Sequence, residues 1–492
     1  MLLLILVPIL IISFIFLRLF GYFIWLCIKS RYLPGPECNS FFFGNFLQTP
    51  KTPTEAVKYL QREAVKLRAA GENLIRVRGF CFYVVMPLDG EGLRPLLNSS
   101  EEITKAQNYE IMKPWIGEGL LTSTGSKWHG RRRLLTPAFH YTILQGNAEL
   151  VDNHARILLD IISEQQHGVV DIYELLRLCS LDVICDTAMS YDLDAQRNPD
   201  QTYIKAVAEF NHIASMCTVD PRLYLVLGLG FGYAQRYKEL QHILTAFTTR
   251  IIMERIADYN VEEIKPGRKA FLDIMIAQRV ESGMTIEDIR EEVDTFMFAG
   301  HDTTSSAMSW FLWCMATNPE IQSRVREEID EIFEHSADRS CTMADIGRME
   351  YFDRCIKESL RLFSPAPSVG RVLLNDLTIG KHVVPAGSNI FITPALIHNN
   401  DQVYKDVRKF DPDRFLPENV AARRPFDYIP FSAGARNCIG QKFALIEMKV
   451  IISWVLRRFT LTSTREQDDI TAVPEVVLRP AGELPITFHA RT

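Results

Sequence analysis

A ten-residue segment near the C-terminus, 431–440, combines a cysteine, an arginine and two glycines at close spacing. It reads Phe-Ser-Ala-Gly-Ala-Arg-Asn-Cys-Ile-Gly, so Cys438 follows Arg436 by two positions and Phe431 by seven. A thiolate at Cys438 can bind a haem iron and supply electron density that favours cleavage of an O–O bond. Arg436 can pair with a haem propionate through charge-assisted hydrogen bonds. The segment therefore predicts a haem-thiolate centre, whereas a cysteine without such surroundings is more often an inert core residue.

A second unusual segment lies inside a long apolar stretch, where the sequence Ala-Gly-His-Asp-Thr-Thr fills 299–304. The stretch opens with a capping box, Thr285-Ile-Glu-Asp288, and Asn-Pro ends it after Ala316, which predicts one long helix over 285–316. A glycine inside a helix costs about 1 kcal/mol relative to alanine. Such a departure from helix preference is typical of a functional site. The alternative is a kinked helix whose hydroxyls bond back to backbone carbonyls.

Both segments resemble signatures of one enzyme superfamily, the cytochromes P450. Residues 431–440 match the pattern Phe-x-x-Gly-x-Arg-x-Cys-x-Gly, and 292–304 resembles the corresponding signature of family 4. The resemblance implies the cytochrome P450 fold and a haem b cofactor. It makes Cys438 the iron ligand and places Phe431 and Arg436 among the cofactor-binding residues.

The family also implies roles for four residues of the segment 299–304. Ala299 and Gly300 open a groove for dioxygen beside the iron, while Asp302 and Thr303 deliver the protons that oxygen cleavage requires. Ala299 departs from the family 4 pattern. Many members carry a glutamate there that can form an ester with a haem methyl group, and alanine has no carboxylate. We therefore predict that haem is held non-covalently, apart from the bond between Cys438 and iron.

Three arginines match positions from which the family binds the haem propionates. Trp128-His-Gly-Arg-Arg132 follows the pattern Trp-x-x-x-Arg, Arg371 comes directly after the segment 365–370, and Arg436 precedes the cysteine. Three cations facing two carboxylates would be a reasonable charge balance in a buried pocket. The alternative for Trp128 and Arg132 is a solvated basic surface, because further arginines flank them.

A helical pair, Glu358 and Arg361, and the arginine of Pro-Asp-Arg414-Phe resemble the family's buried network behind the haem. Residues at i and i+3 share one helix face, where these side chains can pair. We assign all three residues a structural role and expect their loss to prevent haem incorporation. The eleven histidines offer no rival metal site, because they show no HxxxH spacing.

The elements that must position these residues are mainly helical. Apolar residues recur with the helical period in seven stretches, and β-like runs are shorter and fewer. The predicted fold class is therefore mainly α with a minor β part, and no repeat or long linker divides the chain after residue 36. The expected helices are 54–69, 147–165, 234–259, 285–316, 319–333, 351–362 and 441–459, and the expected strands lie in 74–86, 369–378, 388–393 and near the C-terminus.

The N-terminus carries a long apolar segment, 2–28, which Arg18 interrupts. About 20 apolar residues cross a bilayer, and the segment lacks the basic start and the small-residue cleavage site of a removable signal peptide. We infer an uncleaved membrane anchor. Lys29 and Arg31 follow it, which places the rest of the chain in the cytosol. Three parts are expected: a membrane anchor at 1–28, a proline-containing hinge at 29–36 and a single haem-thiolate catalytic domain at 37–492.

Composition narrows the class of protein further. The chain has 492 residues and a net charge of −6, without the basic excess of a nucleic-acid binder, so we expect no nucleic-acid partner. Its ten cysteines are scattered singly, without a CxxC pair. This pattern indicates a reducing compartment rather than a disulfide framework.

Together these features predict a monooxygenase that inserts one oxygen atom from O2 into a lipophilic substrate. No GxGxxG fingerprint of a nicotinamide or flavin site is present, so electrons from NADPH must arrive through a separate partner. By resemblance that partner is NADPH-dependent cytochrome P450 reductase in the endoplasmic reticulum membrane, with cytochrome b5 as a second candidate donor. A fatty acid or related lipid is the expected substrate, and a foreign compound or a terpenoid is the alternative. A haem-thiolate isomerase and a non-catalytic haem carrier or sensor are the alternatives of other classes.

Overall fold

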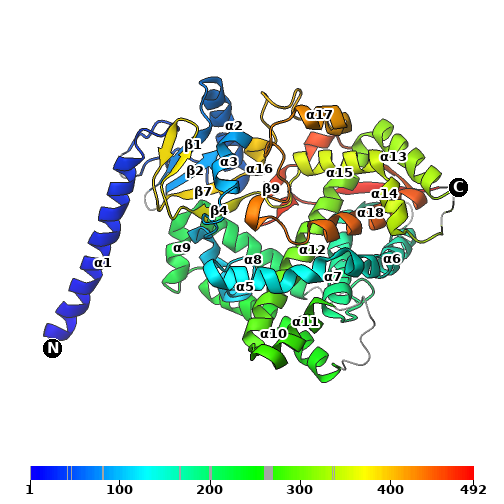
Figure 1. Ribbon diagram of the computed structural model, residues 1–492, viewed down its shortest axis with the longest axis horizontal. Coiled ribbons are helices and arrows are strands. Elements are labelled where there is room, and N and C mark those ends of the chain that lie inside the picture. Colours follow the sequence, from blue (N-terminus) through cyan, green and yellow to red (C-terminus); the bar gives the residue numbers. More distant parts are fainter. Residues whose placement is uncertain are drawn as a thin grey trace.

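The computed structural model divides the chain into a helix-rich body and a smaller β region at one end (Figure 1). The expected mainly α fold with a minor β part is confirmed. Helix α1 (Leu2–Lys29) projects away from the body next to the β region, whereas α12 (Ile286–Thr317) runs through the middle of the helices (Figure 1). The structure describes residues 2–40, 43–45, 47–79, 83–165, 168–198, 202–259, 270–334, 336 and 338–491.

The other helices follow amphipathic or fully buried apolar stretches, and several begin at a side-chain cap. Thr52, Asp89 and Asp171, for example, each accept a hydrogen bond from an amide of the helix that follows. Their bounds are α2 (Pro53–Ala69), α3 (Gly90–Leu97), α4 (Lys113–Ile116), α5 (Gly125–Leu135), α6 (Tyr141–Glu164), α7 (Ile172–Met189), α8 (Thr202–Val219), α9 (Pro221–Gly228), α10 (Ala234–Ala257), α11 (Phe271–Ser282), α13 (Pro319–Ile332), α14 (Met343–Arg348), α15 (Glu350–Leu362), α16 (Pro394–Ile397), α17 (Pro417–Ala422) and α18 (Gln441–Arg458).

The strands form one four-stranded sheet and three smaller sheets. In the largest, ordered β1-β2-β7-β4, only β2 and β7 run parallel, and Arg371 of β4 lies opposite Ile390 of β7. The remaining sheets are β3-β11-β8, β9-β10 and β5-β6. The strand bounds are β1 (Leu74–Arg78), β2 (Tyr83–Pro87), β3 (Val169–Asp171), β4 (Val369–Val372), β5 (Leu377–Ile379), β6 (His382–Val384), β7 (Asn389–Ile392), β8 (Phe459–Thr462), β9 (Ala472–Pro474), β10 (Leu478–Pro480) and β11 (Pro485–Ala490).

Helix α12 forms the centre of the body. The expected capping box is present, because the Thr285 hydroxyl accepts a hydrogen bond from the Asp288 amide while the Asp288 carboxylate accepts one from the Thr285 amide. Helix α7 packs along α12. Farther along, the fully buried Trp310 stacks on Phe363 with ring centroids 4.2 Å apart. Because protein surrounds α12 over most of its length, the segment 299–304 is held in a fixed position.

Helix α1 is exposed along most of its length and buried only where it meets the sheet. Large apolar side chains from Leu6 to Leu19 face outward, and the helix is long and apolar enough to cross a membrane. By contrast, Leu26 is buried and packs with Leu33 in one apolar cluster with residues of the β region. The expected hinge is also tied to the sheet, since the Arg76 amide donates to the Pro34 carbonyl at 2.7 Å. The link between α1 and the body is therefore docked rather than free.

Candidate active site

Cys438 lies at the end of a tight loop that leads directly into α18. Its amide donates to the Phe431 carbonyl at 2.9 Å, and α18 begins three residues after the cysteine. Among the nine cysteines that the structure describes, Cys438 alone is exposed. The surrounding protein nevertheless desolvates the thiol and raises its pKa, whereas the amides of Gly440 and Gln441 and the charge of Arg132 lower it. The positive end of α18 therefore faces the sulfur, as the sequence predicts, and favours a thiolate.

Arg436 is held by backbone carbonyls rather than by an acidic side chain. It donates to the carbonyls of Leu120 at 3.5 Å, Leu121 at 3.4 Å and Ser123 at 2.9 Å. Its guanidinium also lies 4.7 Å from the ring centroid of the buried Trp128. Trp128 and Arg436, which are far apart in sequence, thus meet beside the cysteine loop.

Two further cations lie close to Arg436 and also lack an acidic partner. Arg371 is buried on β4 and forms a β-bridge with Lys105, whose amine lies 3.3 Å from the Tyr109 hydroxyl. Within the described part of the chain, no carboxylate lies within 4.0 Å of Lys105, Arg371 or Arg436. Burial and then the charge of Arg371 lower the pKa of Arg436 to about 9, and the pKa values of Lys105 and Arg371 are also lowered, mainly by burial. Arg371 is buried and Lys105 and Arg436 are half-buried, so an anion bound beside them would compensate their charge.

Lys105 is the member of this cluster that sequence reasoning missed. It stands alone in a polar stretch, and only the β-bridge to Arg371 brings it to the site. The exposed sulfur and the unneutralised cations together fit a metalloporphyrin that carries two carboxylates. The donor set therefore matches the haem that the sequence implies.

Arg132, the arginine of the Trp-x-x-x-Arg pattern, is bound to the cysteine loop. Both of its terminal nitrogens donate to Asn437, at 2.9 Å to the carbonyl and 2.7 Å to the side-chain oxygen. These bonds tie α5 to the residue that precedes Cys438. Arg132 therefore clamps the cysteine loop and supplies a positive charge near the sulfur, and its expected contact with a propionate stays a prediction.

The four expected residues of α12 occupy consecutive turns but have different surroundings. The Thr303 hydroxyl donates to the Ala299 carbonyl at 2.7 Å. This hydrogen bond from a hydroxyl to the carbonyl four residues earlier is the one expected if the segment were only a kinked helix. A Cβ atom on Gly300 would lie 2.7 Å from Ile184 Cδ1, so the glycine lets α7 approach α12. The side-chain partners of the buried Asp302 lie on α7 and α8.

Asp302 is held by two side chains, Asn211 and Arg177, that no sequence motif indicated. Asn211 of α8 donates to one carboxylate oxygen at 2.9 Å, and Arg177 Nε of α7 lies 3.7 Å from the other. Arg177 also donates to the partly exposed Glu174 at 3.1 Å. A chain of charged groups thus runs from the surface to the residue beside Thr303.

The network behind the site is formed as the sequence predicts. Arg361 donates to both oxygens of Glu358, at 2.7 and 2.8 Å, and Arg414 donates to the same carboxylate at 3.2 Å. Glu358 and Arg361 are fully buried. Arg361 donates in addition to the His398 carbonyl at 2.9 Å, so the network joins α15 to the loops after α16 and before α17.

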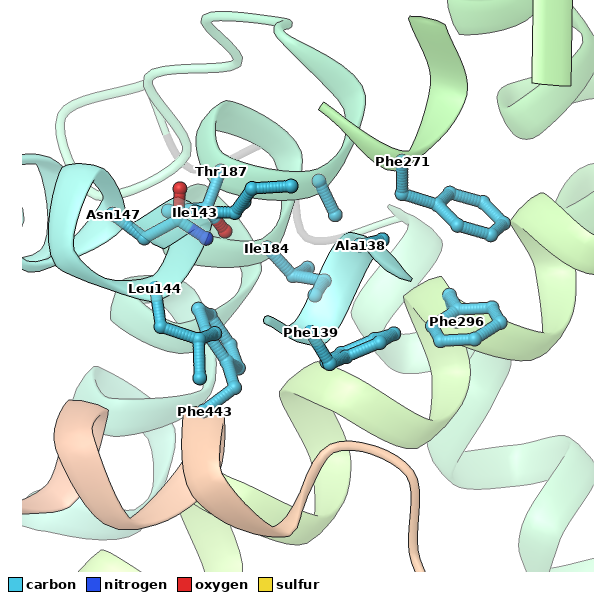
Figure 2. Close-up of a pocket in the computed structure, with 11 residues that line it drawn as sticks. Ala138, Phe139, Ile143, Leu144, Asn147, Ile184, Thr187, Phe271, Phe296 and Phe443 are labelled. Carbon is cyan, nitrogen blue, oxygen red and sulfur yellow. The ribbon is translucent and has the colours of Figure 1, made fainter. Parts of the chain in front are cut away.

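A small apolar cavity of about 20 Å³ adjoins the site between α6, α7, α11, α12 and α18 (Figure 2). This volume is room for about one water molecule. Ile184, the residue that packs on Gly300, forms part of its wall, and Phe139 stacks on Phe296 with centroids 5.6 Å apart. The full lining is Ala138, Phe139, Ile143, Leu144, Asn147, Ile184, Thr187, Ala188, Phe271, Phe296 and Phe443.

Comparison with known proteins identifies the family. The family model described as "Cytochrome P450" matches residues 33–487. The chain belongs to the cytochrome P450 family. Its relatives include cytochrome P450 4c3 of Drosophila melanogaster, 39% identical over 83% of this chain and 80% of the relative, and human cytochrome P450 4V2, 38% identical over 82% and 79%. These relatives place this cytochrome P450 in family 4.

The fold agrees with solved structures of the family. A crystal structure of the cytochrome P450 CYP102L1 superposes with a TM-score of 0.79 at 22% identity and covers 93% of this chain and 99% of its own. The haem domain of cytochrome P450DA gives a TM-score of 0.78, also at 22% identity, over 94% and 98%. This cytochrome P450 is therefore a monooxygenase that binds haem b through a cysteine–iron bond and requires O2, a substrate and a redox partner.

Proposed function

We propose that this cytochrome P450 hydroxylates a fatty acid or a related lipid, with electrons that NADPH supplies through a separate flavoprotein reductase. The reaction takes up the substrate, O2, two electrons and two protons and gives the hydroxylated product and water. The observation that carries the proposal is the exposed Cys438 on a loop whose Arg436 lies close to the buried Arg371, with no acidic partner for either arginine among the described residues. When bound, the haem would supply an iron centre that activates dioxygen.

The cofactor-binding roles follow from the donor set. We assign Cys438 to the iron, and Arg371 and Arg436, joined by Lys105, to the two propionates. Trp128 supports Arg436 by its ring, and Phe431 holds the cysteine loop through its carbonyl. Ala299 offers no carboxylate for an ester, so the haem is held only by the iron–sulfur bond and non-covalent contacts.

Proton delivery is assigned to Thr303 and Asp302. Thr303 keeps its hydroxyl proton in a hydrogen bond to the Ala299 carbonyl, next to the position expected for dioxygen. Asp302 can bring a proton to Thr303 only after its carboxylate leaves Arg177 or Asn211, because both hold it in the α7–α8 direction. Arg177 and Glu174 supply the polar route by which this carboxylate regains a proton from solvent.

The surface around the cysteine loop supports docking of a negatively charged reductase, with cytochrome b5 as a second donor. Lys442 and Arg133 are exposed there. Two nearby arginines have partners within the chain: Arg423 donates to the Arg414 carbonyl, and the exposed Arg424 pairs with Asp427. Lys442 and Arg133 are therefore the residues that we assign to partner binding.

Membrane attachment supports a lipid substrate. We propose that α1 anchors the protein in the endoplasmic reticulum membrane with residues 37–492 as one cytosolic catalytic domain. A second apolar surface consists of large side chains on α9 and the loop after it, each between 39% and 68% exposed. Such a patch favours contact with lipid. Its residues are Tyr224, Leu225, Val226, Leu229, Phe231 and Tyr233.

The test uses the full chain in lipid vesicles with purified reductase, NADPH and separate isotope-labelled panels of long-chain fatty acids and terpenoids. We expect substrate-induced spectral shifts and hydroxylated fatty acids by mass spectrometry. Hydroxylation of terpenoids alone would overturn the lipid assignment, and absence of NADPH-dependent turnover on both panels would favour a haem carrier or sensor. Cys438→Ser is the control, which should abolish the thiolate-specific Soret band of the ferrous carbon monoxide complex.

A further inference from the structure

The segment 115–123 connects the start of α12 to the cation Arg436, and we call it the strap. It runs from the end of α4 to the loop before α5 and passes close to α12. A Cβ atom on Gly119 would lie 2.4 Å from the Thr295 hydroxyl oxygen, so only glycine fits there. Three hydrogen bonds join the strap to α12: Arg290 donates to the Trp115 carbonyl at 2.9 Å, the Glu118 amide donates to Glu291 at 2.8 Å, and the Leu120 amide donates to Glu292 at 2.9 Å.

Leu120 is the residue of the strap that contacts both α12 and Arg436. Its amide is held by the Glu292 carboxylate, and its carbonyl accepts from Arg436. The carbonyls of Leu121 and Ser123, which follow directly, accept from the same guanidinium. Within the described residues Arg436 has no acidic partner, so these carbonyls fix its position. Any shift of the strap at Leu120 therefore shifts Arg436.

Glu292 is buried and charged groups face it from two helices. It is fully buried, and its second oxygen has no hydrogen-bond partner but lies 3.6 Å from Arg131 Nε of α5. Burial raises its pKa to about 7, while the Leu120 amide and Arg131 lower it. Lys127 of α5 and Glu291 are the other charges nearby, and they pair with each other at 2.9 Å. Taking a carboxylate out of water for one backbone amide and one arginine at 3.6 Å is costly, which points to a positioning task.

We propose that Glu292 is a positioning residue for the cofactor: it anchors Leu120 to α12, and the strap in turn holds Arg436 where it binds a haem carboxylate. The proposal rests on the role of Arg436 given under the proposed function. In this way α12, the helix that carries Thr303, also fixes the position of Arg436, the cation assigned to the haem carboxylate.

The experiment measures the rate of haem transfer from the ferric holoprotein to excess apomyoglobin. Glu292→Ala removes the acceptor of the Leu120 amide and should speed haem loss about tenfold, the effect of losing one hydrogen bond to a charged group. Glu292→Gln keeps an acceptor oxygen and should stay within about threefold of wild type. Glu291→Ala is the matched control, because it frees the strap at Glu118 but leaves the bond at Leu120.

The double variant Glu292→Ala/Arg436→Ala decides whether Glu292 acts through Arg436. We expect it to lose haem no faster than Arg436→Ala alone, because the strap then has nothing to position. Multiplied effects, or equal effects of Glu292→Ala and Glu291→Ala, would overturn the proposal. If Arg436→Ala itself retains haem normally, the proposed role of Arg436 fails instead, so the two failures are distinguishable.

A second readout applies if Glu292→Ala does not incorporate haem. The wild-type rate should then rise relative to that of Glu292→Gln as the pH falls below about 7, because the protonated acid is a weaker acceptor. The Glu291→Gln variant should keep the wild-type profile. Identical profiles of wild type and Glu292→Gln would overturn the proposal.

Discussion

Replacing Gly300 by alanine separates two roles for this residue, a packing role seen here and the oxygen groove implied by the family. The new Cβ atom would lie 2.7 Å from Cδ1 and 2.8 Å from Cγ1 of Ile184, but 3.5 Å from its Cβ. Only the far end of Ile184 is in the way. That side chain also lines the small cavity in Figure 2, which leaves space into which it can turn.

The opposing energies are similar in size. Alanine stabilises a helix interior by about 1 kcal/mol relative to glycine. Forcing Ile184 off its preferred rotamer costs about 0.5–1.5 kcal/mol. We therefore expect Gly300→Ala to change the free energy of unfolding by less than about 1 kcal/mol. Ile184→Val alone removes Cδ1 and should destabilise by about 0.5–1.5 kcal/mol. The double variant lacks the contact with Cδ1 but keeps the one with Cγ1 at 2.8 Å. Its free energy of unfolding should therefore exceed the value expected from adding the two single effects by about 0.5 kcal/mol.

The assay is thermal inactivation of the holoprotein, followed by the ferrous carbon monoxide spectrum, for wild type, both single variants and the double variant. Additive shifts in the inactivation temperature would refute the packing argument. Product formation per NADPH consumed is measured on the same four proteins. A loss of coupling in Gly300→Ala that Ile184→Val does not relieve would show that the oxygen groove, and not packing, requires the glycine.

Three further outcomes are expected. Burial raises the pKa of Glu447 to about 8, so the folded protein keeps a proton that the unfolded chain releases above about pH 4.5. The free energy of unfolding should therefore fall as the pH rises from about 5 to 8. Glu447→Gln should remove this part of the pH dependence in denaturant titrations. Acidified acetone should extract the haem from the wild type, and haem that stays on the polypeptide would contradict the argument from Ala299. Glu358→Ala leaves two arginines facing no carboxylate, at a cost of about 3–5 kcal/mol, and should yield protein without the ferrous carbon monoxide band; normal haem content would count against the structural role of the network.

The elements that the sequence predicts well are those with a local signal. The capping box at Thr285 and the Asn-Pro break give α12 to within one residue at each end. The pairing of Glu358 with Arg361 follows from their spacing on one helix face. Helix α7, in contrast, is buried on nearly every side, so apolar residues show no helical period there and no helix was expected.

The parts of the site that escaped prediction depend on contacts between distant segments. Lys105 reaches the cations only through the bridge to β4, and Arg177 reaches Asp302 only because α7 packs along α12. Arg132 matches a family pattern, but that pattern does not indicate its hydrogen bonds to Asn437. Spacing along the chain carries no information on such partners.

The docked end of α1 limits how the protein can stand on a membrane. Because Leu26 and Leu33 pack with the β region and Pro34 bonds to β1, α1 and the largest sheet tilt together. A bilayer that held α1 would thereby set both the height of the catalytic body above the membrane and its angle to the membrane plane. With α1 in a bilayer, as proposed, one edge of the molecule would face the lipid throughout turnover, and a redox partner would meet the cysteine loop at a constant distance above the membrane.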